Sequence, residues 1–302
     1  MMEPLSHHLS EPQRAGTSRR AIVSRLTGVA RRSPIGVVSC ALLLIMVIAA
    51  VLAPQVTPYG PLELHRVDRL QSPNLRYWLG TDSFGRDQFS RIVYGARISL
   101  WVGVAPIAIS LVVGGFTGVI SGLFGGWLDA AIQRVVDALM AFPALLLVLV
   151  IVALLGPSET NIVLVLALVT IPAISRVARG ATLVVATQPY VLSARAVGAT
   201  NWRIAMVHVV PNVFAPVLVV GASLIGTAIL AEASLSFLGL GIPPPAPSWG
   251  NLLGGENRDL FEAAPWLAIF PGLAITITVL LFNLLGDALR DELDPRTRGR
   301  AG

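Results

Sequence analysis

Hydrophobic residues in this chain fall into six long runs separated by shorter polar stretches. The runs are residues 35–53, 98–124, 138–156, 162–175, 209–231 and 263–286. A helix rises about 1.5 Å per residue, so about 20 apolar residues cross a hydrocarbon layer about 30 Å thick. The pattern therefore predicts an all-α membrane protein with six transmembrane helices. The fourth run is short, and we expect its helix to take residues from both sides.

The first run has an alternative interpretation as the core of a signal peptide, because Val51, Leu52 and Ala53 resemble a cleavage site. The run is too long for such a core, and Pro54 follows it directly. We interpret it as the first spanning helix. In the second run, Gly118 and Gly122 are spaced for close contact between helices, either within this subunit or with a partner.

Composition supports a membrane protein and excludes several functions. Of 302 residues, 54% are hydrophobic and 13% charged, which is more apolar surface than one soluble domain buries. The net charge of +5 comes from arginines at the ends of apolar runs, which argues against nucleic-acid binding. The chain has no lysine, so it cannot contain a GxxxxGK[ST] phosphate loop. Its single Cys40 excludes an intrachain disulfide.

Arginine placement predicts the topology. Four arginines and no acidic residue lie between positions 176 and 208, and both chain ends are also basic. We therefore predict a cytoplasmic tail at 1–34, with an amphipathic helix near 18–32, and a cytoplasmic tail at 289–302. Between them we predict the first helix at 35–53, an extracytoplasmic loop at 54–97 and a core at 98–288, with a cytoplasmic segment at 179–211. The predicted location is a bacterial inner membrane, crossed several times. The long outer loop carries six arginines and is the exception to this pattern.

One cytoplasmic stretch, YVLSARAVGATNWRIAMVHVVPN, runs from Tyr190 to Asn212. Pro189 suits the first turn of a helix, and Gly198 suits the left-handed residue that ends one. Thr200 or Asn201 can cap the next helix. The spacing predicts two short helices joined by an elbow.

The second helix of this elbow carries an apolar stripe that leads into the fifth spanning helix. The stripe consists of Trp202, Met206, Val209 and Val210. Two interpretations remain open from periodicity alone. The elbow either offers a rigid helix to a partner outside the membrane or anchors the loop among lipid head groups.

The same residues resemble the cytoplasmic loop of ABC importer permeases, which reads Glu-Ala-Ala, three residues, Gly, and a distant Pro. Here the matching positions are Leu192, Ser193, Ala194, Arg195, Gly198, Ala199, His208 and Pro211. Leu192 stands where the family usually has Glu, and Ser193 stands where it has the first Ala. The departure puts in doubt any ionic contact of that glutamate, while the spacing of the elbow is kept.

Three further stretches resemble the dipeptide, oligopeptide and nickel permeases, in particular the C-type subunit. They are LGTDSFGRDQFSRIVYGARISL (79–100), AEASLSFLGLGIPPPAPSWGNLL (231–253) and NLLGDALRDELDPR (283–296). The resemblance implies a type I importer permease with a coupling helix between the fourth and fifth spans. It assigns outer-loop order or binding-protein docking to Gly80, Thr81, Asp82, Gly85, Arg86, Asp87, Ser248, Trp249 and Gly250.

The resemblance also implies partners: a B-type permease, two cytoplasmic ATPases that bind ATP and Mg, and an extracytoplasmic binding protein. It implies that the chain itself is not an enzyme and holds no cofactor or metal. Short peptides are the cargo it favours, with nickel chelates, glutathione or heme as alternatives.

An ion-coupled secondary transporter is the less favoured alternative, because Glu232 and Asp287 lie near the ends of their spans. An intramembrane enzyme is disfavoured because no catalytic motif appears, and His7, His8, His65 and His208 lie outside the spans.

Overall fold

The computed structural model describes residues 33–293. Almost all of the predicted N-terminal tail, with its amphipathic helix, lies outside the described residues, and so does most of the C-terminal tail.

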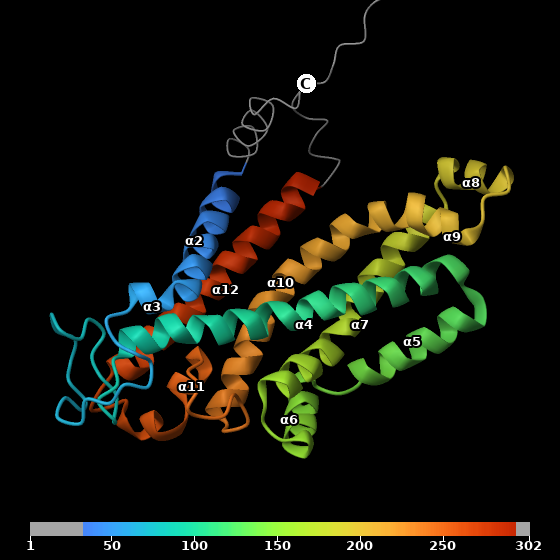
Figure 1. Ribbon diagram of the computed structural model, residues 1–302. Coiled ribbons are helices and arrows are strands. Elements are labelled where there is room, and N and C mark those ends of the chain that lie inside the picture. The colour runs from blue at the N-terminus through green and yellow to red at the C-terminus, as the bar shows by residue number, and fades with distance from the viewer. Residues whose placement is uncertain (1–32, 294–302) are drawn as a thin grey trace, which may run out of the picture.

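The described chain forms helices joined by loops, of which the segment 57–87 is the longest, and it contains no strand within residues 33–293 (Figure 1). The helices are α2 (Pro34–Val51), α3 (Ala53–Val56), α4 (Gln88–Phe124), α5 (Gly126–Met140), α6 (Ala144–Leu155), α7 (Glu159–Ala186), α8 (Pro189–Ala196), α9 (Asn201–Ile204), the π-helix η1 (Ala205–Val209), α10 (Val210–Phe237), α11 (Trp249–Leu253), the 3-10 helix η2 (Gly255–Leu260) and α12 (Trp266–Leu293).

Five helices are long and apolar enough to cross a membrane: α2, α4, α7, the continuous segment Asn201–Phe237, and α12. The pair α5 and α6 makes a sixth span if its two parts are counted together. The fourth helix takes residues from both sides of its apolar run, as expected. The fifth and sixth helices are longer than their runs, at 201–237 and 266–293.

The third predicted span, residues 138–156, is wrong as a straight helix. The chain bends by 85° between α5 and α6. Pro143 lies at this bend, where it caps α6 and cannot continue the backbone hydrogen bonds of α5. Hydropathy joined the end of α5 to α6 because the residues at the bend are themselves apolar.

The last part of the predicted outer loop at 54–97 is helical, because α4 begins at Gln88, before the predicted apolar run. Asp87 caps this helix by accepting a hydrogen bond from the Ser90 N–H at 2.8 Å. Arg97 donates to the carbonyls of Ala50 and Val51 at the end of α2, at 2.6 and 2.9 Å. A charged residue therefore lies inside the helix, where the hydropathy pattern had placed the loop boundary.

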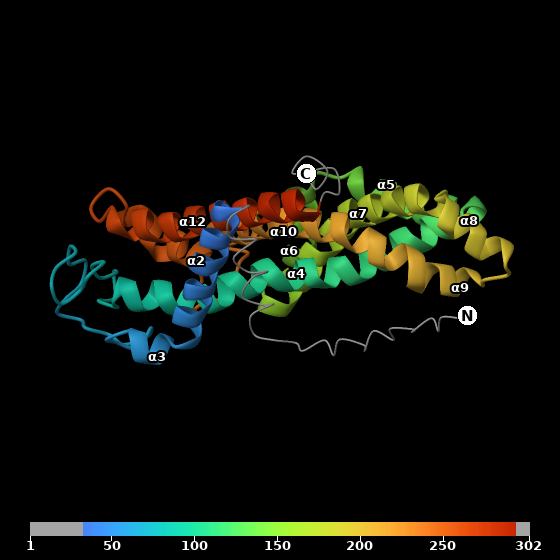
Figure 2. The ribbon, with the colours of Figure 1, turned by 90° about the horizontal axis from the view of Figure 1, so that it is seen from above.

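The closest helix pair is α4 with α7, and glycines on α4 make it possible. A Cβ on Gly118 would lie 2.4 Å from the carbonyl oxygen of Ser175, and one on Gly122 would lie 2.8 Å from Thr182 Cβ. The two glycines therefore pack within this subunit, which decides between the two interpretations of their spacing. Seen from above, α12, α10 and α7 run along one side of the molecule and α4 runs along the other side (Figure 2).

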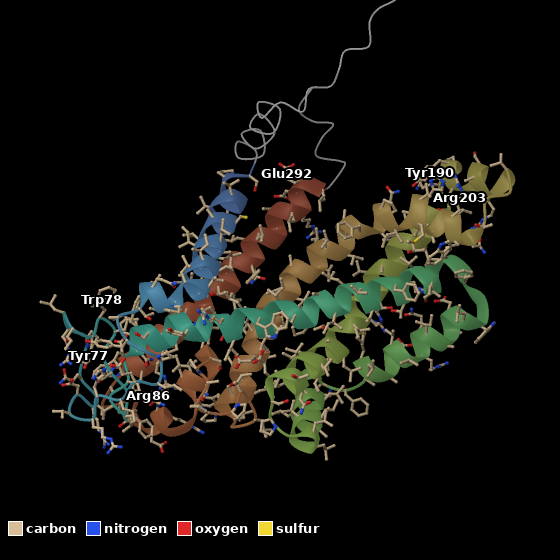
Figure 3. The ribbon with its side chains drawn as sticks, in the orientation of Figure 1. Tyr77, Trp78, Arg86, Tyr190, Arg203 and Glu292 are labelled. Atoms are coloured by element: carbon tan, nitrogen blue, oxygen red, sulfur yellow. The ribbon has the colours of Figure 1, made fainter. Side chains whose placement is uncertain are left out.

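The molecule has two distinct ends (Figure 3). The elbow, defined here as residues 189–204, lies at one end, where Tyr190 and Arg203 are labelled. The cap, defined as residues 57–87 and 238–265, lies at the opposite end with Tyr77, Trp78 and Arg86. The start of α2 lies beside the end of α12, since a Cβ on Gly36 would lie 2.4 Å from Ala288 Cβ. Both described chain ends therefore lie on one side of the bundle.

Candidate functional site

The elbow has the geometry that its sequence predicts. Pro189 occupies the first turn of α8, and Gly198 has a φ of +86°. Beyond the helix, the N–H of Gly198 bonds to the carbonyl of Arg195, and the N–H of Ala199 bonds to that of Ala194, both at 3.0 Å. These two bonds form a Schellman motif, which needs the left-handed residue. The hydroxyl of Thr200 then caps α9 by accepting from Arg203 N–H.

The inner face of the elbow is fixed to the bundle. Val191, Ile204 and Val209 are fully buried and belong to a core that includes Ile174 and Ala178 of α7. The rings of Tyr190 and His208 also lie in contact, with their centroids 5.8 Å apart. The elbow is therefore packed against both α7 and the segment that leads into α10.

Pro211 explains an irregularity that the sequence did not predict. Residues Ala205–Val209 form a π-helix immediately before α10. Pro211 has no N–H to donate to the carbonyl four residues earlier, and the wider π turn accommodates its ring. The side chain of Asn212 donates to the His208 carbonyl at 2.7 Å. The helix therefore continues from the elbow into the span without a break.

The outer face of the elbow is open and has no acidic residue between positions 187 and 210. Leu192 is 50% exposed and Val197 is 85% exposed, and Arg195 and Ser193 are also exposed. Ala194 and Ala199 are partly buried. The exposed surface of the elbow is therefore an apolar edge beside the cationic side chain of Arg195.

Two arginines of α7 near the elbow form ion pairs with acidic residues of α5. Arg179 binds both carboxylate oxygens of Asp129 at 2.6 and 2.7 Å, and Arg176 pairs with Asp137 at 2.6 Å. Both acids lie on α5. These pairs join α5 to α7 beside the elbow.

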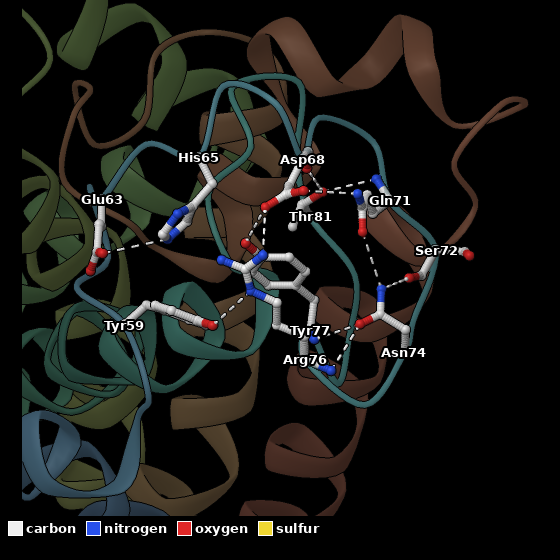
Figure 4. A network of polar contacts seen from close by, with 10 residues as sticks. All are labelled: Tyr59, Glu63, His65, Asp68, Gln71, Ser72, Asn74, Arg76, Tyr77 and Thr81. Atoms are coloured by element: carbon white, nitrogen blue, oxygen red, sulfur yellow. Dashed lines mark hydrogen bonds and ion pairs between the residues drawn. The ribbon is translucent and has the colours of Figure 1, made fainter.

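A polar network organises one half of the cap (Figure 4). Asp68 accepts hydrogen bonds from the Tyr77 hydroxyl at 2.8 Å and the Gln71 side chain at 3.0 Å, and it pairs with Arg76 at 3.1 Å. Thr81 donates to the Asp68 carbonyl. Burial raises the pKa of Tyr77 to about 12, helped by its bond to the Asp68 carboxylate.

The predicted residues from Gly80 to Asp87 form one tight turn. Asp82 is fully buried, accepts from the backbone N–H of Phe84 and Arg86, and pairs with Arg86 at 2.6 Å and with Arg91. Gly80 and Gly85 have φ values of +78° and +79°. Thr81 and Asp87 form a bridge that closes the turn. Trp266 donates to the Thr81 carbonyl at 3.1 Å, which fixes the turn to α12.

Ser248, Trp249 and Gly250 fix the other half of the cap. Ser248 caps α11, and Trp249 is 1% exposed, with its indole N–H donating to the Ile92 carbonyl at 3.0 Å. Gly250 lies so close to α10 that a Cβ would be 2.6 Å from Ala233 Cα. These buried side chains hold the cap together, so a docking role would act through the shape that they impose.

Glu232 has a structural role that its position in the sequence did not predict. It is 1% exposed, and its Oε1 accepts from Ser236 at 2.7 Å and from Ser248 at 2.8 Å. It therefore connects α10 to α11 within this subunit. Asp287, the other candidate, is exposed near the end of α12. Serines near Glu232 in the sequence were the available signal for a buried, hydrogen-bonded carboxylate. Ser248, at the start of α11, lies sixteen residues away in sequence, so the signal was weak.

A cavity of about 730 Å³ lies between α7, α10 and α12. Asn212, Ser223, Thr227 and Arg290 give its otherwise apolar wall several polar groups. Among residues 33–293, no group of three His, Cys, Asp or Glu side chains is placed to hold a metal ion.

Comparison with known proteins gives two family matches. Residues 114–299 match the binding-protein-dependent transport system inner membrane component, and residues 30–73 match the N-terminal TM domain of oligopeptide transport permease C.

Three relatives cover most of the chain. The dipeptide transport system permease protein DppC of Alkalihalophilus pseudofirmus is 40% identical over 89% of this chain and 88% of its own. A putative peptide transport system permease protein of Brucella suis is 45% identical over 85% and 86%. The glutathione transport system permease protein GsiD of Pectobacterium atrosepticum is 42% identical over 88% and 89%.

Among solved structures, the methionine ABC transporter MetNI in inward-facing conformations matches with a TM-score of 0.55 and 17% identity. The match covers 67% of this chain and 95% of that chain, and it supports the fold alone. The family matches and the relatives together show more. The chain is a multi-pass inner membrane protein that belongs to the inner membrane components of binding-protein-dependent transport systems, the permeases of ABC importers.

Proposed function

We propose that this chain forms half of the translocation pathway of an ATP-driven peptide importer. The observation that carries the proposal is the elbow: its exposed edge stands at the end opposite the cap, while its inner face is locked into the core. We further propose that the elbow and both chain ends face the cytoplasm, because the arginines of the elbow lie there without acids.

Movement would pass through the molecule along one continuous element. The segment Asn201–Phe237 begins in the elbow and ends beside the cap, where Glu232 holds Ser248. Two partner ATPases would bind ATP and Mg, close together and displace the elbow. The bundle would then tilt as a rigid body and open the cavity to alternate sides of the membrane. All chemistry would take place on the partners.

The proposed complex contains a homologous B-type permease and an extracytoplasmic binding protein that delivers cargo to the cap side. Short peptides are the proposed cargo, because two of the three relatives are named for peptide or dipeptide transport. Glutathione is the second candidate, since the third relative is named for it. The exposed Leu192 implies that the ATPase socket is apolar at the position where family members usually present a glutamate.

The test is ATP-dependent uptake of labelled di- and tripeptides, glutathione and nickel by the complete complex in proteoliposomes. Gly198→Pro should abolish uptake, because proline cannot adopt the positive φ and removes the N–H that bonds to Arg195. Gly198→Asn is the matched control, since asparagine tolerates this conformation, and it should retain uptake. Normal uptake with Gly198→Pro would refute the coupling role, and uptake of glutathione alone would replace the cargo.

A further inference from the structure

A small cavity opens in the cap between the turn that precedes α4 and the segment around α11. Its volume is about 210 Å³, and its polar lining consists of Arg86, Arg91, Asn251 and Asn257. Phe84 and Pro244 supply apolar wall. Pockets that enclose a whole small ligand usually exceed about 300 Å³. This cavity is therefore of a size for the end of a ligand.

Among the lining residues that the structure describes, two are cations and none is acidic. Arg86 and Arg91 both pair with Asp82, which is fully buried and does not line the cavity. One carboxylate therefore pairs with two guanidinium groups. Asp87, the nearest other acid in sequence, is engaged in capping α4 through Ser90. A guanidinium presents several N–H donors, so each arginine has more donors than Asp82 can satisfy.

Two lining residues also carry buried polar atoms without a partner. Arg91 is 4% exposed, and its Nε has no hydrogen bond; Asn257 is 5% exposed, and its Oδ1 has none. Leaving such atoms unpaired costs about 1–3 kcal/mol each, so a native site normally satisfies them. One atom is a donor and the other an acceptor. Both atoms are almost fully enclosed, so a ligand in the cavity reaches them only if the two side chains turn toward it. A group that pairs with both must accept one hydrogen bond and donate another, as a water molecule also does.

We propose that this cavity binds the terminal carboxylate of a peptide together with the N–H of its last amide. The carboxylate would accept from Arg91 and Arg86, and the amide N–H would donate to Asn257. The ordinary geometry of a peptide C-terminus supplies an acceptor and a donor on adjacent groups, whereas a fully deprotonated anion such as sulfate supplies acceptors only. This inference rests on the proposed function in one respect, namely that the cap faces the side from which peptide arrives.

The test is binding of N-acetyl-alanyl-alanine to the full-length chain in nanodiscs, by calorimetry, against the same compound as its C-terminal amide. The free acid should bind at least tenfold more tightly than the amide. Arg86→Gln and Asn257→Ala should each remove that preference. Arg69→Gln, which removes an exposed arginine of the same cap outside the cavity, should leave it unchanged. Thermal unfolding of each variant shows whether the cap still folds.

Equal binding of acid and amide, no binding of either, or a preference that survives both cavity variants would overturn the proposal. Asn257→Ala keeps both arginine pairs, so it tests the site even if Arg86→Gln unfolds the turn. Glu256→Gln adds one arm, because Glu256 adjoins two lining residues in sequence. Binding that appears only in Glu256→Gln would assign the cavity to this chain's own carboxylate and overturn peptide binding. The assay needs neither ATPase nor transport, so its failure leaves the importer proposal standing.

Discussion

At the scale of single residues, the most consequential side chains are polar groups buried in the cap or at the end of α10 beside it. Glu232, Asp82 and Tyr77 are each 1% exposed or less. A carboxyl or hydroxyl removed from water is tolerated only when other groups replace its hydration. The carboxylate of Asp82, the hydroxyl of Tyr77 and Oε1 of Glu232 have such partners, whereas Oε2 of Glu232 has none. One partner of each, namely Arg91, Asp68 and Ser248, lies nine or more residues away in sequence. The cap thus owes its shape to a few specific bonds, which single substitutions can test.

Glu232→Ala should destabilise the protein by about 2–4 kcal/mol, because it leaves the hydroxyls of Ser236 and Ser248 unpaired and opens a cavity. Glu232→Gln should cost less, since its amide oxygen can still accept both bonds. Thermal or denaturant unfolding in nanodiscs measures which of the two Glu232 variants loses more stability. Glu159→Gln, at an exposed helix start, is the control. Equal losses for the two Glu232 variants would contradict this account.

Tyr77 should make the cap sensitive to strongly alkaline pH. Its pKa is raised to about 12, mainly by burial, above the ordinary value of about 10. Because the unfolded chain releases this proton first, the contribution of Tyr77 to the free energy of unfolding should be constant below about pH 10 and should fall between about pH 10 and 12.

The measurement is unfolding of the wild type and of Tyr77→Phe over this pH range. The wild type should lose more stability than the variant. Absorbance should also show one of the four tyrosines titrating late, a signal that Tyr77→Phe removes. Parallel stability curves would show that Tyr77 is not the titrating group.

At the scale of elements, the helix caps and the elbow could be predicted correctly, because neighbouring residues in the sequence determine them. Gly198 and Thr200 act on neighbouring backbone groups, and their spacing alone predicts the elbow. The 85° bend between α5 and α6 was missed, since hydropathy does not distinguish one straight span from two short helices at Pro143. The bond between Glu232 and Ser248 was also missed, since it depends on how α11 folds back onto α10.

The contact between α4 and α7 predicts opposite effects at two glycines on one helix. Gly118→Ala should destabilise the bundle, because its Cβ would lie 2.4 Å from the Ser175 carbonyl oxygen and 2.6 Å from Ala178. Gly115→Ala meets nothing within 4 Å and should be neutral or stabilising by up to about 1 kcal/mol. Unfolding of both variants in nanodiscs checks the sign. A loss at Gly115 as large as that at Gly118 would show that the helix contact is not the cause.

At the scale of the whole molecule, the elbow and the cap lie at opposite ends of one set of packed helices. The pair α4 and α7 forms a tightly packed block, and α5 is joined to it by the pairs of Asp129 and Asp137. The segment Asn201–Phe237 runs past this block from the elbow to Glu232. In the proposed importer, a signal from the cap can pass along this segment to the elbow while α11 remains fixed to α10.

Gly250→Ala tests this requirement in the complete complex. A Cβ at position 250 would lie 2.6 Å from Ala233 Cα, so α11 must move away from α10, while the elbow at the opposite end keeps its contacts. We expect the ATPase rate without binding protein to be unchanged and its stimulation by loaded binding protein to fall. Gly272→Ala, on α12 with nothing within 4 Å, should keep full stimulation. A drop in both rates for Gly250→Ala would indicate general unfolding, and full stimulation would mean that the signal from the cap does not pass through α11.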